Sequence, residues 1–473
     1  MKTRSRRRSQ ILENVEILTI AAEGKTIAKV DDLVIFVSNA IPGDIVDLKV
    51  IKHKDNYNEA IAVNFHKYSE KRIVADCAHF GTCGGCKWQN LKYDDQLEYK
   101  QKQVVDALER IGKINLPEIN KILPSEKIFY YRNKLEFTFS NLRWFTREEI
   151  EIADKNANGF GFHAPGMFDK VIDISKCYLQ KDPSNKIRDS IKEFTAINKY
   201  EYYDHRAKTG YMRNVVVRTS TTGDLMVIVI FGYEDVEKRT ALLDYLAEQV
   251  PEITSLIYII NKKLNDAYSD LEPLLYKGND YIYEQMGDLK FKIGAKSFYQ
   301  TNSEQAFNLY KVALDFAGLT GDEIVYDLYT GTGTIANFVA SKSKKVIGVE
   351  YIPEAIEDAK VNSEINNISN TSFFSGDLKD VLTKQFILQN GEPDVVILDP
   401  PRAGVHNNVL ENLLFALPKR IVYVSCNPAT QARDINILSK SYEVIKVQPV
   451  DMFPHTHHVE NVVLLSLINN EKI

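Results

Sequence analysis

The fold of the C-terminal part of this chain is decided by residues 324–334, which read IVYDLYTGTGT. The first five of these residues predict a buried strand, and the glycines after them predict a tight strand-to-helix turn. Outward from this point, apolar segments recur at 345–349, 394–398 and 421–425, with helical stretches between them. This alternation predicts a parallel, doubly wound sheet whose ligand site lies at the carboxyl ends of its strands.

Acidic residues follow the successive strands of this predicted sheet. Glu350 ends the second strand, about 20 residues after the glycine turn, where an acid would bind both ribose hydroxyls of a nucleotide-type cofactor. Asp377 ends a third strand region and is expected on the adenine side. Thr334 stands where a pyrophosphate-binding loop has its third glycine. Asp399 opens the sequence DPPR, which is typical of methyltransferases acting on planar bases, so we favour S-adenosylmethionine over NAD.

The fifth strand of the sheet delivers Cys426 to the same edge. A lone cysteine is usually a small packed hydrophobe, but its place beside the DPPR strand favours a nucleophile. Carbon 5 of uracil is a poor nucleophile, and addition of a thiolate at carbon 6 makes it reactive towards a sulfonium methyl group. Because the thiolate is the active form, the site is predicted to lower the pKa of Cys426.

A base is then needed to remove the proton from carbon 5. The segment HTHHVE at 455–460 supplies candidates just before the final predicted strand. A metal site is an alternative reading of this segment, but its spacing matches no standard helical zinc motif. We therefore expect Glu460 to be the base and the histidines to position the loop or the substrate.

Four further cysteines form a second constellation: Cys77, Cys83, Cys86 and Cys177. Gly84 and Gly85 would let the chain wrap tightly and aim amides at sulfur. Four thiolates fit zinc or an iron–sulfur cluster, and the spacing leaves both open while excluding the C-x3-C-x2-C pattern of radical enzymes.

The rest of the chain predicts a multidomain α/β protein of 473 residues. We expect a basic tail at 1–10, either solvated or contacting phosphates; an OB-like barrel at 11–70; and a central, mainly antiparallel β domain at 71–295. A helix at about 93–111 is expected to pack on the catalytic domain, which would occupy 296–473. No signal peptide, membrane span or obligate protein partner is evident, so the expected location is cytoplasmic.

In combination these motifs resemble the RNA 5-methyluridine methyltransferases, most closely the bacterial 23S rRNA (uracil-5-)-methyltransferases with an N-terminal TRAM domain. The resemblance covers essentially the whole chain. The matching segments are the barrel at 11–68, the cysteine segment with Trp88-Gln89, Tyr131-Arg132-Asn133-Lys134, Gly161-Phe162-His163 with Cys177, Phe298-Tyr299-Gln300-Thr301-Asn302, the loop after Asp327, DPPRAG at 399–404, SCNP at 425–428 and HTHHVE at 455–460.

The resemblance implies a TRAM barrel, a Rossmann-like methyltransferase domain and a [4Fe–4S] cluster on the four cysteines, with zinc as the alternative metal. It implies S-adenosylmethionine contacts at Gln300, Tyr329, Glu350, Asp377 and Asp399, with Cys426 as nucleophile and Glu460 as base. Thr334 is a further predicted cofactor contact, although relatives often have Asn there and Cys at the position of Thr330.

The implied activity is methylation of carbon 5 of a uridine in RNA, with 23S rRNA as the expected target. The target base would have to be flipped out of its stack to reach Cys426. Arg132, Lys134 and Arg213 are candidates for holding RNA phosphates, or else exposed strand charges. The alternatives are tRNA uracil-5 methylation, RNA cytosine-5 methylation, and a non-enzymatic iron–sulfur RNA-binding module.

Overall fold

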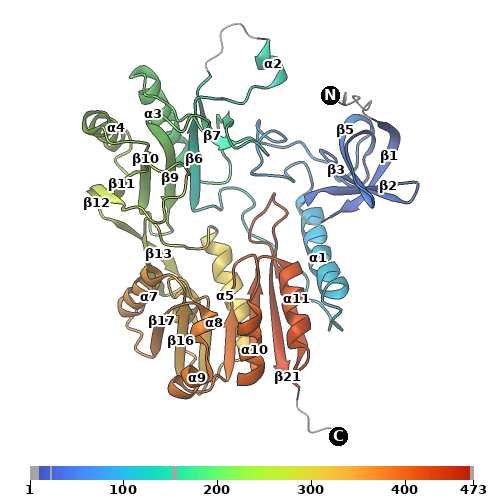
Figure 1. Ribbon diagram of the computed structural model, residues 1–473, viewed down its shortest axis with the longest axis vertical. Helices are drawn as coiled ribbons and strands as arrows, with labels where there is room; N and C mark the ends of the chain where they lie inside the picture. The colour runs from blue at the N-terminus through green and yellow to red at the C-terminus, as the bar shows by residue number, and fades with distance from the viewer. Residues whose placement is uncertain (1–9, 22–23, 152–156, 469–473) are drawn as a thin grey trace, which may run out of the picture.

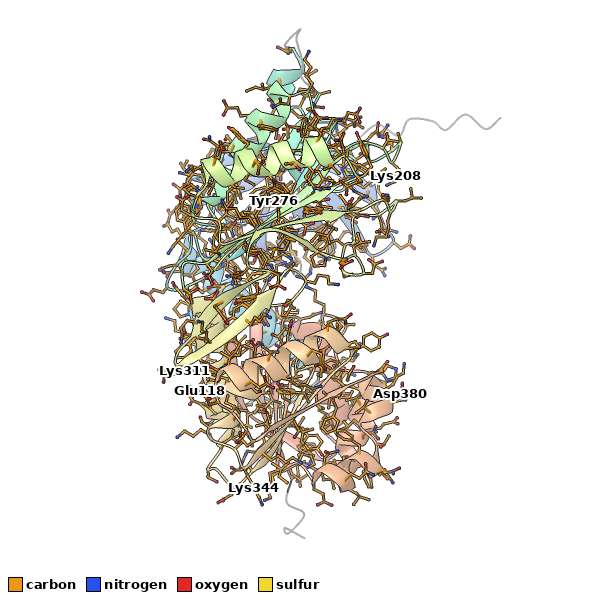
Figure 2. All side chains as sticks on the ribbon, turned by 90° about the vertical axis from the view of Figure 1, so that its left-hand side faces the viewer. Glu118, Lys208, Tyr276, Lys311, Lys344 and Asp380 are labelled. Carbon is orange, nitrogen blue, oxygen red and sulfur yellow. The ribbon has the colours of Figure 1, made fainter. Side chains whose placement is uncertain are left out.

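The computed structural model of the protein describes residues 10–21, 24–151 and 157–468 (Figure 1). The basic residues of the predicted tail, Lys2 to Arg8, lie outside the described residues. The protein is built from an N-terminal barrel, a central sheet and a C-terminal sheet. Figure 2 shows the last two as an upper part carrying Lys208 and Tyr276 and a lower part carrying Lys311, Lys344 and Asp380.

The N-terminal part is a closed barrel in which the strand order is β1-β2-β3-β5-β4. Buried and exposed residues alternate along its strands; in β4, for example, Val46, Leu48 and Val50 point inward. This confirms the OB-like barrel predicted from the sequence. Its strands are β1 (Ile11–Ile20), β2 (Thr26–Val30), β3 (Leu33–Ser38), β4 (Ile45–His53) and β5 (Tyr57–Lys67).

The central part is a seven-stranded sheet of order β12-β11-β10-β9-β6-β7-β8. Its described strands pair antiparallel except for β10 with β11, as expected for a mainly antiparallel domain. The strands are β6 (Lys134–Ser140), β7 (Gly159–His163), β8 (Val171–Asp173), β9 (Met212–Thr219), β10 (Leu225–Phe231), β11 (Ser255–Ile260) and β12 (Leu274–Gly278), and the helices are α2 (Arg147–Ile150), α3 (Ser184–Ile197) and α4 (Val236–Gln249).

The C-terminal part is the predicted doubly wound sheet, with strand order β17-β16-β15-β18-β19-β21-β20. Six of its strands run in the same direction, and β21 lies antiparallel between β19 and β20. Its strands are β15 (Ile324–Leu328), β16 (Lys345–Glu350), β17 (Thr371–Ser375), β18 (Val395–Leu398), β19 (Arg420–Ser425), β20 (Tyr442–Val450) and β21 (Glu460–Leu467).

Helices cover both faces of this sheet, and a small ribbon leads into it (Figure 1). Adjacent residues of β15 point to opposite faces of the sheet. Val325 packs into the core that includes α5 and α6, and Tyr326 packs into the core that includes α10 and α11. The remaining elements are the ribbon β13 (Tyr281–Met286) with β14 (Leu289–Gly294), and the helices α5 (Ser303–Ala317), α6 (Thr334–Ala340), α7 (Pro353–Ile365), α8 (Leu378–Val381), α9 (Lys384–Asn390), α10 (Asn407–Ala416) and α11 (Pro428–Leu438).

Helix α1 (Tyr93–Arg110) precedes the central sheet in sequence but packs against α11. Leu97, Val104 and Leu108 belong to the core on that face of the C-terminal sheet. Figure 1 shows α1 lying between the barrel and α11. No helix in the described part of the chain is long and apolar enough to cross a membrane.

Candidate active site

The glycine loop after β15 is held in a strained, open conformation. Tyr329 has a φ of 67°, unusual for a residue other than glycine, and its N–H donates to the Val349 carbonyl at 3.0 Å. At Gly331, with a φ of 54°, an added Cβ would meet nothing within 4 Å, so this side of the loop is open to a ligand. At Gly333 a Cβ would lie 2.9 Å from that of Ala359, so close packing of α6 on α7 requires glycine.

Two of the predicted cofactor-binding acids lie at neighbouring strand ends. Glu350 is fixed through both oxygens, which accept the N–H groups of Gly331 and Ile352 at 3.1 Å each. Asp377 caps α8 and forms an ion pair with Lys379 at 2.9 Å, and this partner lowers the pKa of Asp377. The structure therefore brings both carboxylates to the edge of the glycine loop.

Behind the loop, two buried aspartates lie at the ends of β15 and β18. Burial raises the pKa of Asp327 and of Asp399 to about 7 each. The Thr330 hydroxyl donates to Oδ2 of Asp327, while Oδ1 is buried without a hydrogen-bond partner. Thr334 begins α6 and is buried, with Oγ1 3.3 Å from that of Thr332.

The candidate nucleophile and base meet through the pairing of two strands. Ser425, the last residue of β19, pairs with Asn461 of antiparallel β21. The residue after Ser425 is Cys426 and the residue before Asn461 is Glu460, so the register sets these two side by side. Gln431 of α11 locks this register because its amide donates to the carbonyls of Tyr423 and Asn461 at 2.8 and 3.1 Å.

The electrostatics of this pair differ from the sequence-based prediction. Burial, with a contribution from Glu460, raises the pKa of the half-buried Cys426 thiol to about 11, where we predicted a lowered value. Burial and Asp399 also raise the pKa of Glu460 to about 8. Arg402 acts in the opposite direction on both groups and hydrogen-bonds to the Cys426 sulfur. Motif spacing could not reveal this clustering of buried acids.

The DPPR and SCNP loops are joined to each other. The Asn427 side chain donates to the Arg402 carbonyl at 3.0 Å and also caps α11. The Thr430 hydroxyl donates to the same carbonyl at 3.2 Å. These contacts hold the loop with Arg402 against the loop with Cys426, and Arg402 Nη2 lies 3.4 Å from His458 Nε2. Arg402 is a site residue to which the sequence analysis gave no role.

The histidine segment is a buried connector to distant parts of the chain. His455, with a φ of 64°, accepts the N–H groups of Lys87 and Trp88 at its carbonyl, at 2.8 and 3.0 Å. Its own N–H donates to Oε1 of Gln96 at 2.9 Å. Burial lowers the pKa of His455 and His458 to about 4 and of His457 to about 3, so all three are neutral. The loop before Glu460 is thus positioned by α1 and by the cysteine segment, which sequence spacing could not predict.

Cys77, Cys83, Cys86 and Cys177 line a single cavity of about 530 Å³. The Gly85 N–H bonds the sulfur of Cys83, the Leu179 N–H bonds that of Cys177, and Gln89 bonds that of Cys86. Burial raises the thiol pKa of Cys83 to about 11, and that of Cys177 in the same direction, with neighbouring cysteines adding to the shift. Partly buried thiols that line one cavity and accept amide N–H groups fit a site for a thiophilic metal centre.

Of the three predicted phosphate-binding residues, two face this cavity and one does not. Arg132 and Lys134 line it, beside Thr301 of the segment that leads to α5. Arg213 is 1% exposed and donates to the carbonyls of Asn261, Lys263 and Asn265, so the prediction that it holds phosphate is wrong. Gln300, from the same segment as Thr301, hydrogen-bonds the Tyr310 side chain.

The fold and these loops form a sheet edge that suits a nucleotide-type cofactor, beside a cysteine–carboxylate pair. Comparisons with known proteins agree with a site of this kind. The family described as tRNA (Uracil-5-)-methyltransferase matches residues 273–468, and the TRAM domain matches residues 12–63. An uncharacterized RNA methyltransferase of Bacteroides thetaiotaomicron is 59% identical over 95% of this chain and 100% of that protein. One of Porphyromonas gingivalis is 55% identical over 95% of this chain and 99% of that protein.

A solved structure shows the same architecture. The Pyrococcus abyssi tRNA (uracil-54, C5)-methyltransferase in complex with S-adenosyl-L-homocysteine is 29% identical, with a TM-score of 0.75 over 96% of this chain and 100% of that one. The chain belongs to the TRAM-containing family of RNA (uracil-5-)-methyltransferases.

Proposed function

We propose that this protein transfers the methyl group of S-adenosylmethionine to carbon 5 of a uridine in RNA. The observation that carries the proposal is the strand register that sets Cys426 beside Glu460 at the edge where Asp399 and the glycine loop also end. The open side of Gly331, the fixed carboxylate of Glu350 and the unpartnered Oδ1 of Asp327 suit a polar adenosyl ligand.

The chain's own residues supply the acid–base and covalent chemistry. The Cys426 sulfur forms a bond to carbon 6 of the ring, and the electron pair of the 5,6 double bond moves towards carbon 5. S-adenosylmethionine, when bound, would supply an electrophilic methyl group, which carbon 5 takes with this electron pair as the sulfonium–methyl bond breaks. Glu460 then removes the proton from carbon 5, and the carbon–sulfur bond breaks as the double bond re-forms.

The thiol needs help to ionise because burial raises its pKa to about 11. Arg402, which hydrogen-bonds the sulfur, is the group that stabilises the thiolate. Glu460, with its pKa of about 8, is poised to exchange a proton near neutral pH. We assign Arg402 the role of holding the charge and Glu460 the role of moving protons.

The proposed target is 23S rRNA, on the resemblance drawn from the sequence motifs. A uridine of tRNA is the second candidate, because the solved relative from Pyrococcus abyssi is a tRNA (uracil-54, C5)-methyltransferase. In either RNA the target must be flipped out of its stack, and Arg132 and Lys134 are proposed to hold phosphates nearby.

We further propose that the four cysteines hold a [4Fe–4S] cluster. Thiolates around one zinc ion lie about 3.8 Å apart, since each Zn–S bond is about 2.3 Å. Within the described residues, no three of these sulfurs come within 4.8 Å of one another. Wider spacing suits a cluster in which each cysteine binds a different iron atom. Stoichiometric zinc without iron after anaerobic purification would refute this assignment.

Product analysis tests the activity. The enzyme is incubated with labelled S-adenosylmethionine and with 23S rRNA or tRNA from a strain lacking the gene, and the RNA is digested to nucleosides. Label in 5-methyluridine is expected, and 5-methylcytidine instead would refute uracil specificity. The RNA that accepts label decides between the two targets.

A covalent trap tests the mechanism and the non-enzymatic alternative. RNA containing 5-fluorouridine should form a stable adduct with the wild-type enzyme, because the fluorine at carbon 5 cannot leave as a proton. Cys426→Ala should form no adduct and should lose methylation at least 10³-fold while still binding RNA. An RNA-binding module without activity would give no adduct with either protein.

A further inference from the structure

Three side chains of metal-ligand type meet on the central domain. His163 ends β7, His205 lies in the turn before β9, and Asp266 lies in the loop between β11 and β12. One ligand atom from each lies within 4.8 Å of the other two, and among the described residues this is the only such group of three. None of the three belongs to the catalytic pair or to the cysteine set.

The hydrogen bonding of His205 fixes which of its nitrogens is free. Its Nε2 lies 3.0 Å from the Phe139 carbonyl oxygen, which can only accept, so Nε2 carries the ring proton. The other nitrogen, Nδ1, then presents a lone pair 3.9 Å from Oδ2 of Asp266. Two acceptors that face each other at a buried residue repel unless a positive charge lies between them.

His163 brings an unsatisfied ring nitrogen to the same place. Its Nδ1 is buried and has no hydrogen-bond partner. Its ring centroid is 5.1 Å from that of His205, and the two planes are inclined by 74°. A buried ring nitrogen without a partner is costly, and coordination of a cation would remove that cost.

The carboxylate is held in place by a buried arginine. Arg213 donates to Oδ1 of Asp266 at 2.7 Å and to the carbonyls of Asn261, Lys263 and Asn265 at 2.7–2.8 Å. Because Arg213 occupies Oδ1, it leaves Oδ2 facing the histidines. A supporting layer that orients the ligands is characteristic of built metal sites.

We propose that His163, His205 and Asp266 bind a divalent transition-metal ion, with Zn²⁺ as the best fit. Two imidazoles and one carboxylate are preferred zinc ligands, and three protein ligands leave the fourth tetrahedral position to water. Ligand atoms around zinc lie about 3.4 Å apart, so closure on the ion shortens each of these distances by at most about 1.4 Å. The ion would tie β7, the turn at 204–209 and the loop at 261–273 together.

Cobalt is the probe that distinguishes this site from the cysteines. Purified full-length protein with its thiol centre loaded is titrated with Co²⁺. We expect one equivalent to bind with visible d–d absorption but without the near-ultraviolet thiolate-to-cobalt band, and one equivalent of Zn²⁺ to displace it. No binding, or a spectrum with the thiolate band, would overturn the proposal.

Variants locate the ligands. His163→Ala, His205→Ala and Asp266→Asn should each weaken Co²⁺ and Zn²⁺ binding at least 100-fold, and Zn²⁺ should raise the thermal midpoint of the wild type but not of these variants. Asp266→Asn keeps an oxygen for Arg213 and so preserves the loop. His53→Ala, on the exposed end of β4, is the matched control and should bind as the wild type does.

Binding that survives Asp266→Asn or His163→Ala would place the ion elsewhere and refute the site. Iron content is measured on the same samples and should not change in these variants. If the protein contains no iron but these substitutions still abolish Co²⁺ binding, the cluster assignment is refuted and the proposed histidine–aspartate site stands.

Discussion

Glu460 combines burial with a role that requires its ionised form. The fold holds its proton tightly, with a pKa of about 8 against an ordinary value of 4.5. Binding of this proton therefore stabilises the folded state fully below about pH 4.5, and this stabilisation is lost as the pH rises through about 8. A carboxyl group that is buried at such a cost in stability is typical of a catalytic position.

The Glu460→Gln variant separates these two effects. Methylation should fall at least 10³-fold, and a covalent enzyme–RNA complex should accumulate because no base removes the carbon-5 proton. The thermal midpoint of the variant should exceed that of the wild type by a few degrees at pH 9, and by less at pH 6. Denaturing gels and thermal melts at the two pH values measure this; a variant less stable at pH 9 would contradict the raised pKa.

The same pKa values predict the pH dependence of catalysis. Both Glu460, with a pKa of about 8, and the Cys426 thiol, with a pKa of about 11, are protonated in the free enzyme at pH 6. Because both protons must be lost, we expect kcat/KM to rise by up to about 100-fold per pH unit between pH 6 and 8 and by about tenfold per pH unit above that. A profile that is flat or falls over this range would contradict the raised pKa values, because kcat/KM reports the groups of the free enzyme. Arg402→Lys should shift the profile to higher pH.

At the scale of elements, α1 and the loop before β21 form one unit. Lys100 of α1 lies fully buried and donates to Oδ1 of Asp451 at 2.6 Å and to the Phe453 carbonyl at 3.0 Å. Tyr93 donates to the other oxygen of Asp451 at 2.9 Å. These contacts fix the start of the loop that carries the histidines and ends at Glu460.

Replacing Lys100 by Met should therefore destabilise the protein by about 3–5 kcal/mol, because an unpaired carboxylate would remain buried. Chemical denaturation measures the loss. Lys360→Met, which breaks the exposed pair with Glu357 on α7, is the matched control and should change stability by less than about 0.5 kcal/mol. Equal effects of the two substitutions would contradict the structural role of Lys100.

Local patterns predicted the elements themselves closely. The apolar run at 324–328 is a strand with those bounds, and the helix expected at about 93–111 spans Tyr93–Arg110. Periodicity and turn residues carry this information within short windows. They also placed Cys426, Asp399 and Glu350 at one sheet edge, because strand ends of a doubly wound sheet share that edge.

Contacts between segments far apart in the sequence could not be predicted from these local patterns. Gln96 and His455 are 359 residues apart in sequence, and nothing in either segment identifies the other. The prediction for Arg213 was wrong for a related reason: its carbonyl partners are supplied by a loop about 50 residues away. The lowered pKa predicted for Cys426 overlooked how many carboxyl groups share its burial.

Over the whole molecule, the cysteine cavity and the active site are mechanically joined. The segment that follows Cys86 donates two backbone N–H groups to the His455 carbonyl. The cysteines are remote from the catalytic motifs in sequence, but this connection leads from one site to the other within a few residues. Loss of the thiol centre should therefore alter the position of Glu460.

We expect Cys83→Ser to lose iron and to lower kcat at least tenfold at saturating RNA, although no residue of the catalytic pair is changed. The physical reason is that the loop at 77–90 would no longer hold the His455 carbonyl in place. Iron analysis and single-turnover methylation measure the two effects. Cys426→Ala should keep its iron, and a Cys83→Ser protein with unchanged kcat would show that the two sites work independently.

The position of β21 has a consequence for how the protein folds during its synthesis. This strand follows β20 along the chain but inserts between β19 and β20, and its first residue is Glu460. While the polypeptide is still being made on a ribosome, no strand yet lies between β19 and β20, and Cys426 lacks the neighbouring carboxyl group of Glu460. A nascent chain can thus collapse around its earlier segments and still be unable to modify the RNA that surrounds it.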